Sequence, residues 1–217
     1  MARAPEGLTR PCILVLVVVA TLFLAPDEST AGSLCWSGKP LPECRTFLIT
    51  ELGVYYRLDE DPTQASDNPV YFTLDLGVMK NVSPVAAMGV TAFGGSGDGH
   101  ARVGARFRYR RWLSHDTSVD IAPGLLFYGS EDGGYTHQAP GLILGTTWNW
   151  RDWVAVGLEV EHSRYEIEGY TPGESASPEK TSDTTWRVGG KLGSAPGVVG
   201  TAALVGFFIY LVSTIEN

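Results

Sequence analysis

Apolar and polar residues alternate along most of this chain with a period of two, which is the spacing of a β-strand. Residues 101–112 (ARVGARFRYRRW) show the pattern most clearly. Val103 and Phe107 fall on one face, and Arg106 and Arg108 fall on the other. A helix would scatter the arginines over most of its circumference and leave no coherent apolar stripe. The segment is therefore predicted to be a strand with one apolar face and one cationic face.

Seven further segments alternate in the same way, so the chain is predicted to be all-β. The eight predicted strands are residues 45–58, 70–79, 85–93, 101–112, 119–128, 141–148, 153–165 and 185–193. The first, third, fifth and seventh connections are long and polar, whereas the second, fourth and sixth are tight turns. This organisation predicts an eight-stranded antiparallel up-and-down β-barrel over residues 45–193. Pro123 lies inside the fifth strand, where it removes a ladder donor, and we expect a β-bulge there.

Glycines on the charged face indicate which face lies inside the barrel. A water-exposed strand position loses stability with glycine, but the interior of an eight-stranded barrel is so narrow that small residues must stand beside long ones. The glycines that share the charged face are Gly53, Gly77, Gly89, Gly104, Gly124, Gly145, Gly157 and Gly189. We therefore expect the charged face to line the lumen and the apolar face to meet lipid.

Charges of both signs balance on this inward face. Buried charges are tolerated when they are paired and hydrogen-bonded, so the lumen is predicted to hold a closed network and not an open pore. The predicted lumen charge network consists of Glu51, Asp75, Arg106, Arg108, Arg110, Asp120, Glu159, Glu161, Arg187 and Lys191. Periodicity alone is also compatible with a soluble, lipocalin-like ligand-binding barrel, in which the arginines face water and the apolar face lines a cavity.

Aromatic residues gather near both ends of the predicted strands. Tryptophans at the tight-turn ends and tyrosines toward the long connections would form the two girdles that lipid headgroups select. The predicted girdle residues are Trp112, Trp148, Trp150 and Trp153 at one end and Tyr56, Tyr71, Tyr128, Tyr135 and Tyr165 at the other.

The first 44 residues lie outside the predicted barrel. Residues 1–31 are predicted to be a signal peptide, because Arg3 and Arg10 precede a short apolar run and small residues precede a cleavage point after Ala31. An uncleaved membrane anchor is the alternative, which the shortness of the run disfavours. In an exported chain, Cys35 and Cys44 predict a disulfide that closes a loop over residues 32–44, and no histidine lies near to favour a metal site.

Residues 194–217 form an apolar tail that the barrel pattern does not explain. Residues 198–215 are apolar on every side and nearly long enough to span hydrocarbon, and Pro196 suits a helix N-terminus. We expect a lipid-embedded helix that packs against the barrel wall through Gly200, Ala203 and Gly206. The alternative is a ninth and tenth strand that complete a larger barrel.

Little in the sequence indicates chemistry. The formal net charge is −8, which argues against nucleic acid as a partner. Glu161, His162 and Ser163 resemble the His/Ser/Glu set of outer-membrane lipid A deacylases, but adjacent strand residues point to opposite faces, so His162 cannot face Ser163. No catalytic residue, metal site or cofactor is predicted. The alternative is a lipid-modifying enzyme that would hydrolyse the acyl chains of lipid A.

A signal peptide, eight amphipathic strands, alternating tight turns and long loops, and a charged lumen together resemble the small outer-membrane barrels of the OmpA/OmpX type. The resemblance covers residues 45–193 and is architectural, so no functional residues are carried over. It implies a transmembrane barrel in the outer membrane of a Gram-negative cell envelope, in contact with membrane lipid and lipopolysaccharide. The expected role is structural or surface-interacting, with the long loops meeting any extracellular partner. The apolar tail departs from such barrels, which commonly end on a strand with a terminal aromatic residue.

Overall fold

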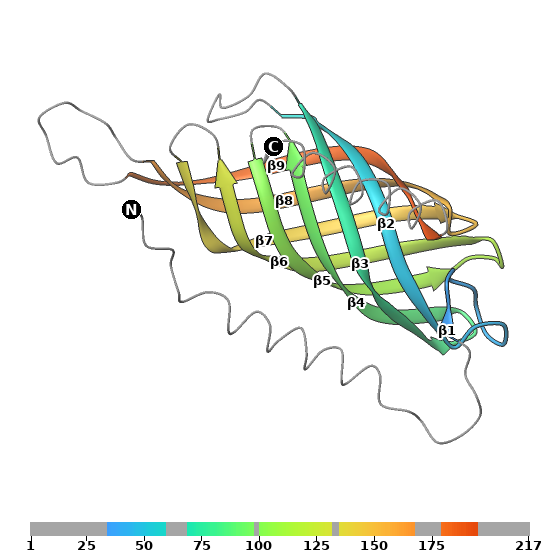
Figure 1. Cartoon of the computed structure of the whole chain (residues 1–217). Coiled ribbons are helices and arrows are strands. Elements are labelled where there is room, and N and C mark those ends of the chain that lie inside the picture. The colour runs from blue at the N-terminus through green and yellow to red at the C-terminus, as the bar shows by residue number, and fades with distance from the viewer. Residues whose placement is uncertain (1–33, 60–68, 98–99, 132–134, 168–178, 195–217) are drawn as a thin grey trace, which may run out of the picture. The chain divides into compact units, whose positions relative to one another are not determined.

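The computed structural model describes residues 34–59, 69–97, 100–131, 135–167 and 179–194, and these residues form a closed barrel (Figure 1). Its strands are β1 (Leu34–Cys35), β2 (Thr46–Arg57), β3 (Val70–Ser83), β4 (Ala86–Gly97), β5 (His100–Trp112), β6 (Thr117–Glu131), β7 (Tyr135–Trp150), β8 (Val154–Ile167) and β9 (Glu179–Leu192). β2 to β9 follow one another around the sheet as antiparallel neighbours, and β9 pairs with β2 to close it. The eight-stranded antiparallel up-and-down barrel is confirmed.

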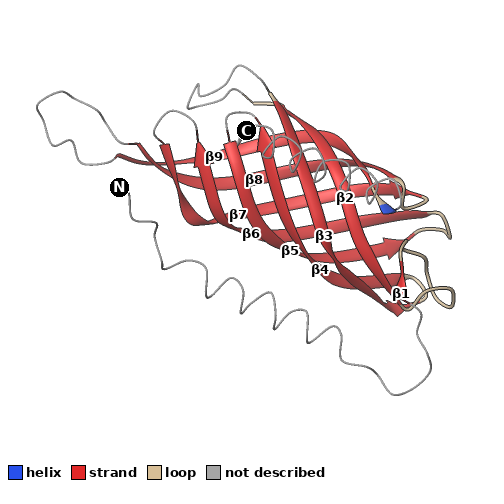
Figure 2. Cartoon of the chain, in the orientation of Figure 1, coloured by secondary structure: helices blue, strands red, loops and turns tan. Residues whose placement is uncertain are grey.

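The described part of the chain is almost entirely strand (Figure 2). None of its helices is long and apolar enough to cross a membrane. The predicted signal peptide and the apolar tail beyond Ser194 lie outside the described residues.

Most strands are longer than predicted, mainly toward the long connections. β4 runs to Gly97 and β9 begins at Glu179, although residues 94–97 and 179–183 were predicted to be loop. β7 likewise begins at Tyr135 and not at residue 141. Alternation of apolar and polar residues appears only where the two faces of a strand lie in different environments. The hydrogen-bonded pairing of the backbone continues beyond that region, so the sequence pattern does not reveal the true ends of the strands.

The bulge expected at Pro123 is absent, and that prediction is wrong. The pairs on either side of it, Arg106 with Gly124 and Tyr109 with Ile121, keep one register between β5 and β6. The register shift of this strand pair lies nearer the long connection. Loss of one ladder donor therefore interrupts local pairing without inserting an extra residue into the strand.

β3 and β4 approach each other so closely that only glycine fits at two inward positions. A Cβ at Gly77 would lie 2.1 Å from the carbonyl oxygen of Val90, and a Cβ at Gly89 would lie 2.1 Å from that of Val78. Both distances are far inside van der Waals contact. The inward glycines thus allow the strong bending that closes a narrow barrel.

Among the predicted girdle residues whose side chains the structure describes, two point into the lumen. Trp148 and Trp150 are 59% and 58% exposed on the outer face, but Trp112 and Tyr71 are buried. Trp112 lies two residues after Arg110 on the inward face of β5, so the parity of the strand places it inside. The girdle prediction is wrong for Trp112 and Tyr71 because it considered their position along the strand and not their face.

An apolar cluster fills the lumen at the tight-turn end. Its members are Cys44, Phe47, Ile49, Met79, Ala87 and Trp112, with Cys35 packed against them. A smaller cluster of Phe93, Leu126 and Ile143 lies elsewhere in the interior. Most of the other buried side chains of the interior are charged or polar.

Candidate functional site: a charged lumen closed by a disulfide loop

All ten residues of the predicted lumen charge network lie inside the barrel, and none is more than 4% exposed. They come from six of the strands, because every second residue of a barrel strand points inward. The structure brings the ten together in ion pairs, some between neighbouring strands and some across the lumen.

Toward the tight-turn end, cations and carboxylates interlock. Arg108 donates two hydrogen bonds to Glu51, with nitrogen–oxygen distances of 2.8 and 2.7 Å. Lys191 lies 2.5 Å from a carboxylate oxygen of Asp75 and 3.3 Å from one of Glu51. Arg108 also lies 3.3 Å from Asp75, so two cations share two carboxylates. These shared ion pairs connect side chains of β2, β3, β5 and β9.

Arg110 forms the last pair before the apolar cluster. Its Nε and Nη2 donate to the two carboxylate oxygens of Asp120 at 2.7 and 2.8 Å. Its remaining terminal nitrogen donates to Asp152 at 2.7 Å. Its guanidinium also stacks over the rings of Phe47 and Trp112, at 5.4 and 5.2 Å from the ring centroids. Arg110 therefore joins the charge network to the apolar cluster.

Nearer the long connections, the network continues through two glutamates of β8. Arg106 lies 2.7 Å from Glu159. Glu161 accepts from Arg102 at 2.5 Å and from Arg187 at 2.9 Å, and the Ser163 hydroxyl donates to it at 2.7 Å. One carboxylate thus serves two guanidinium groups and a hydroxyl.

Aromatic rings cover two of these guanidinium groups. Arg106 lies 4.1 Å from the centroid of the Phe93 ring, and Arg187 lies 4.7 Å from that of the Tyr71 ring. Cation–π contacts of this kind stabilise cations that are withdrawn from water. The arrangement places buried side chains of opposite charge next to one another inside the barrel.

Three charged residues of the lumen were missed by the predicted network. Arg57 and Arg102 are 3% and 1% exposed, and both share the inward parity of their strands, so the alternation could have identified them. Asp152 lies in the turn between β7 and β8, where no strand periodicity applies. Its role depends on contacts far away in the sequence.

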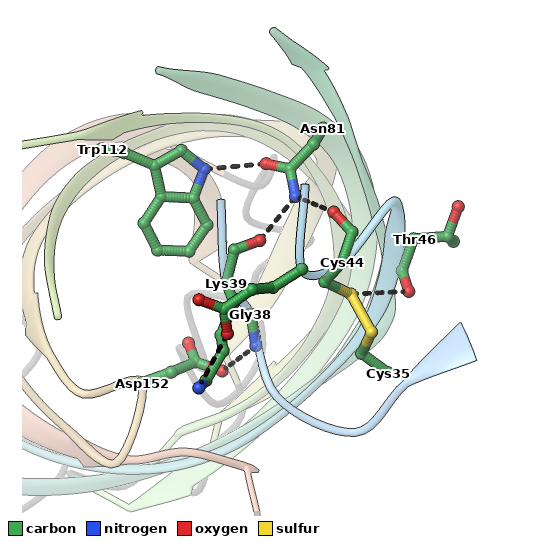
Figure 3. Close-up of a disulfide and its surroundings, with 9 residues drawn as sticks. Cys35, Gly38, Lys39, Cys44, Thr46, Asn81, Trp112 and Asp152 are labelled. Atoms are coloured by element: carbon green, nitrogen blue, oxygen red, sulfur yellow. Dashed lines mark hydrogen bonds and ion pairs between the residues drawn. A yellow bond between two sulfur atoms is a disulfide. The ribbon is translucent and has the colours of Figure 1, made fainter. Parts of the chain in front are cut away.

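The segment before β2 closes the tight-turn end of the barrel (Figure 3). We call residues 34–45 the plug. Cys35 and Cys44 form the predicted disulfide, with 6.2 Å between their Cα atoms. Leu34 and Cys35 pair in parallel with Thr46 and Phe47, so the plug begins as a short extension of the barrel wall.

Two polar side chains of the barrel hold the plug in place (Figure 3). The Asp152 carboxylate accepts a hydrogen bond from the backbone N–H of Gly38 at 2.6 Å. It also accepts hydrogen bonds from the Arg110 guanidinium and the Ser194 hydroxyl. The Asn81 amide donates to the carbonyl oxygens of Lys39 and Cys44 at 2.6 and 2.7 Å. Its amide oxygen accepts from the indole N–H of Trp112 at 2.7 Å. The plug is thus fixed to β3, to β5 and to the β7–β8 turn.

An exposed ion pair connects the plug to the β5–β6 turn. His115 contacts Glu43 through Nε2 and lies 3.2 Å from Asp116 through Nδ1. The hydrogen bond with Glu43 raises the pKa of the His115 imidazole, and the same hydrogen bond lowers the pKa of the Glu43 carboxyl. Beside this pair lies an open cavity of about 340 Å³, whose lining includes Lys39, His115 and Arg151.

The structure separates the side chains of His162 and Ser163. His162 is exposed on the outer face and hydrogen-bonded to Thr184, whereas Ser163 is buried in the lumen. The two side chains therefore lie on opposite sides of the barrel wall, as the strand parity predicted. Within the described residues, no group of three His, Cys, Asp or Glu side chains could hold a metal ion.

The outer face of the barrel is a belt of large apolar side chains. Their exposed fractions lie between 40% and 63% for Val54, Phe72, Leu76, Val103, Phe107, Ile121, Leu125, Leu144, Val156 and Val188. On β3 the outward positions are apolar from Val70 to Val78, and the next outward residue is the exposed Lys80. On β8 the belt gives way to His162 and Arg164 toward the long connections. An exposed apolar surface of this extent marks an interaction with an apolar medium or partner.

Comparisons with known proteins add little to this picture. No family model matches the chain, and no curated protein matches it. A solved structure described as "De novo design of transmembrane beta-barrels" aligns with 72% of this chain and 98% of its own length, at 13% sequence identity and a TM-score of 0.34.

Proposed function

We propose that this chain is an integral outer-membrane β-barrel of the small OmpA/OmpX type, with a structural or surface-interaction role. The observation that carries the proposal is the arrangement of polarity: an apolar belt faces outward and a paired charge network faces inward. In a soluble lipocalin-like barrel this arrangement would be reversed. An apolar medium outside the barrel accounts for both faces together.

The height of the apolar belt supports a bilayer as that medium. The nine residues from Val70 to Val78 span roughly 26 Å along β3, at about 3.3 Å per residue. With a strand tilt of about 40°, this corresponds to a height of roughly 20 Å, close to the band of about 25 Å that membrane barrels present to lipid. Trp148, Trp150 and Trp153 lie exposed at the tight-turn edge of the belt, where tryptophans anchor proteins at the membrane interface.

The proposed orientation places the tight turns and the plug in the periplasm and the long connections outside the cell. Membrane barrels of bacteria have short periplasmic turns and long extracellular loops. A lumen filled by ion pairs supports a scaffold, so recognition of a partner or of lipopolysaccharide falls to the long loops.

Membrane fractionation with electrophoresis tests this proposal. The chain is expected in the outer-membrane fraction, to resist extraction by carbonate, and to migrate differently on an SDS gel with and without boiling. Recovery of a soluble periplasmic protein without a heat-dependent shift would contradict the proposal.

A further inference from the structure

The barrel wall contains a stretch of strand edge that the described strands leave uncovered. β9 pairs with β2 from Leu52 to Arg57, and β1 pairs with β2 at Thr46 and Phe47. Between them, at residues 48–51, no described strand pairs with this side of β2. In a membrane, the backbone groups of an open edge cannot be satisfied by lipid.

The outer faces of β2 and β3 beside this edge carry a continuous apolar patch. Leu48 is the register partner of Val78, and Leu52 is the partner of Leu74, all four pointing outward. These side chains and Thr50 between them are half-buried. Leu76, the register partner of Thr50, completes the patch and is 44% exposed. We call this patch, together with the edge at residues 48–51, the seam.

The described chain ends at the seam. In the register of β9 against β2, Gly193 follows Leu192 toward Glu51, and a Cβ at Gly193 would lie 3.5 Å from Cγ of Glu51. Ser194 then has a φ of 51°, which turns the backbone out of the strand direction. Pro196 cannot donate a ladder hydrogen bond. The described chain therefore leaves the direction of β9 beside the seam.

Residues 198–215 have the composition and length of a segment that would cover the seam. They contain no charged residue, and as a helix they would be roughly 27 Å long, comparable to the apolar belt. Gly200, Ala203 and Gly206 recur every three residues, so they would lie along one side of that helix and allow close packing.

We propose that the C-terminal tail packs against the seam as a lipid-embedded helix and covers the open edge of β2. The inference rests on the proposed membrane location. In this proposal the tail covers the seam, whereas lipid covers the rest of the apolar belt. In that helix Ala203 would lie about 10 Å from Pro196, and Thr50 lies in the middle of the seam, between Leu48 and Leu52.

Paired cysteines test this contact in the full-length protein. The cysteines of the plug are bonded to each other, and Cys12 is replaced by serine in every variant, so that a crosslink reports only the two introduced cysteines. Thr50→Cys with Ala203→Cys is the test pair. Thr146→Cys with Ala203→Cys is the matched control, because Thr146 is also a half-buried, outward-facing threonine, but on β7. Both proteins are oxidised in native membranes and run on non-reducing gels, after the heat-dependent gel shift has shown that each is folded.

The expected result is an intramolecular crosslink for the Thr50 pair that exceeds that of the Thr146 pair several-fold. An equal yield for the two pairs, or no crosslink in the Thr50 pair, would overturn the inference. A crosslink between two chains at Thr50 would also overturn it, because a second copy would then occupy the seam. If the folded protein is membrane-bound in these samples, such failures leave the proposed function intact, whereas a soluble protein would contradict the proposed function itself.

Discussion

Arg108 and Glu51 face each other across the lumen and share two hydrogen bonds of 2.8 and 2.7 Å, although β5 and β2 are not neighbours in the sheet. The pair therefore braces two separate parts of the wall. Glu51→Gln removes the negative charge that pairs with Arg108, and it also removes one of the two carboxylates that pair with Lys191. We predict a loss of roughly 3–5 kcal/mol in the free energy of unfolding, the usual cost of breaking a buried ion pair.

Urea unfolding in detergent micelles measures this loss. Glu43→Gln is the matched control, because it makes the same chemical change at an exposed carboxylate of the plug. We expect the control to change stability by less than about 1 kcal/mol. Equal stability of Glu51→Gln and the unmodified protein would show that the network does not brace the barrel.

Asp152 is predicted to hold the plug in place without holding the barrel together. Asp152→Ala removes the acceptor for the Gly38 N–H and for the Ser194 hydroxyl, at a cost of about 1–3 kcal/mol. It also removes one of the two carboxylates that pair with Arg110, but Arg110 keeps both hydrogen bonds to Asp120, so the barrel wall is expected to lose less than the plug. Hydrogen exchange of the backbone amides in residues 34–45 should become faster, while exchange in the central strands stays slow. Asp116→Ala, a change at a half-exposed carboxylate of the same end, should leave the plug protected. Unchanged exchange in Asp152→Ala would contradict the role of this residue.

The alternation of residues predicted the barrel and its interior because a strand places successive side chains on opposite faces, whatever else surrounds it. The same rule separates His162 from Ser163 and places Glu161 inside. Asp152 could not be predicted in this way, because it lies in a turn and its partners come from the plug, from β5 and from the end of β9. The ends of the strands were also beyond prediction, since backbone pairing continues after the contrast between the faces has ended.

Gly77 provides a test of how closely β3 and β4 approach each other. Gly77→Ala places a Cβ against the backbone oxygen of Val90, which cannot move without shifting the strand, so we predict a loss of roughly 1–3 kcal/mol. Gly94→Ala is the matched control on β4, because the nearest atom to its new Cβ is 3.9 Å away. Thermal or urea unfolding of the two variants should differ clearly. Equal tolerance of both substitutions would contradict the close approach.

The contact between His115 and Glu43 makes the attachment of the plug pH-dependent. Because folding raises the pKa of His115 above its ordinary 6.5, the stabilisation is complete below that value and is lost as the pH rises through the raised pKa. Because folding lowers the pKa of Glu43 below 4.5, the contribution of Glu43 is lost as the pH falls through the lowered pKa. The contact is therefore strongest between the two shifted values.

An NMR titration of the His115 ring protons checks this prediction. The midpoint should lie above 6.5 and should move down in Glu43→Gln, because the hydrogen bond to the Glu43 carboxylate is the largest cause of the raised pKa of His115. A midpoint that is identical in the two proteins would show that the contact does not form in solution.

The central claim is that the barrel presents its apolar face to lipid and encloses its charges, and tryptophan fluorescence tests it most directly. Two variants are prepared that each keep one of the six tryptophans, with phenylalanine at the other five positions. One keeps Trp148, which is 59% exposed on the outer face, and the other keeps Trp112, which is 7% exposed at the end of the lumen. Both are reconstituted into vesicles of lipid with brominated acyl chains. The account predicts strong quenching of Trp148 and little quenching of Trp112. Quenching of Trp112 as strong as that of Trp148, or no quenching of Trp148, would contradict it.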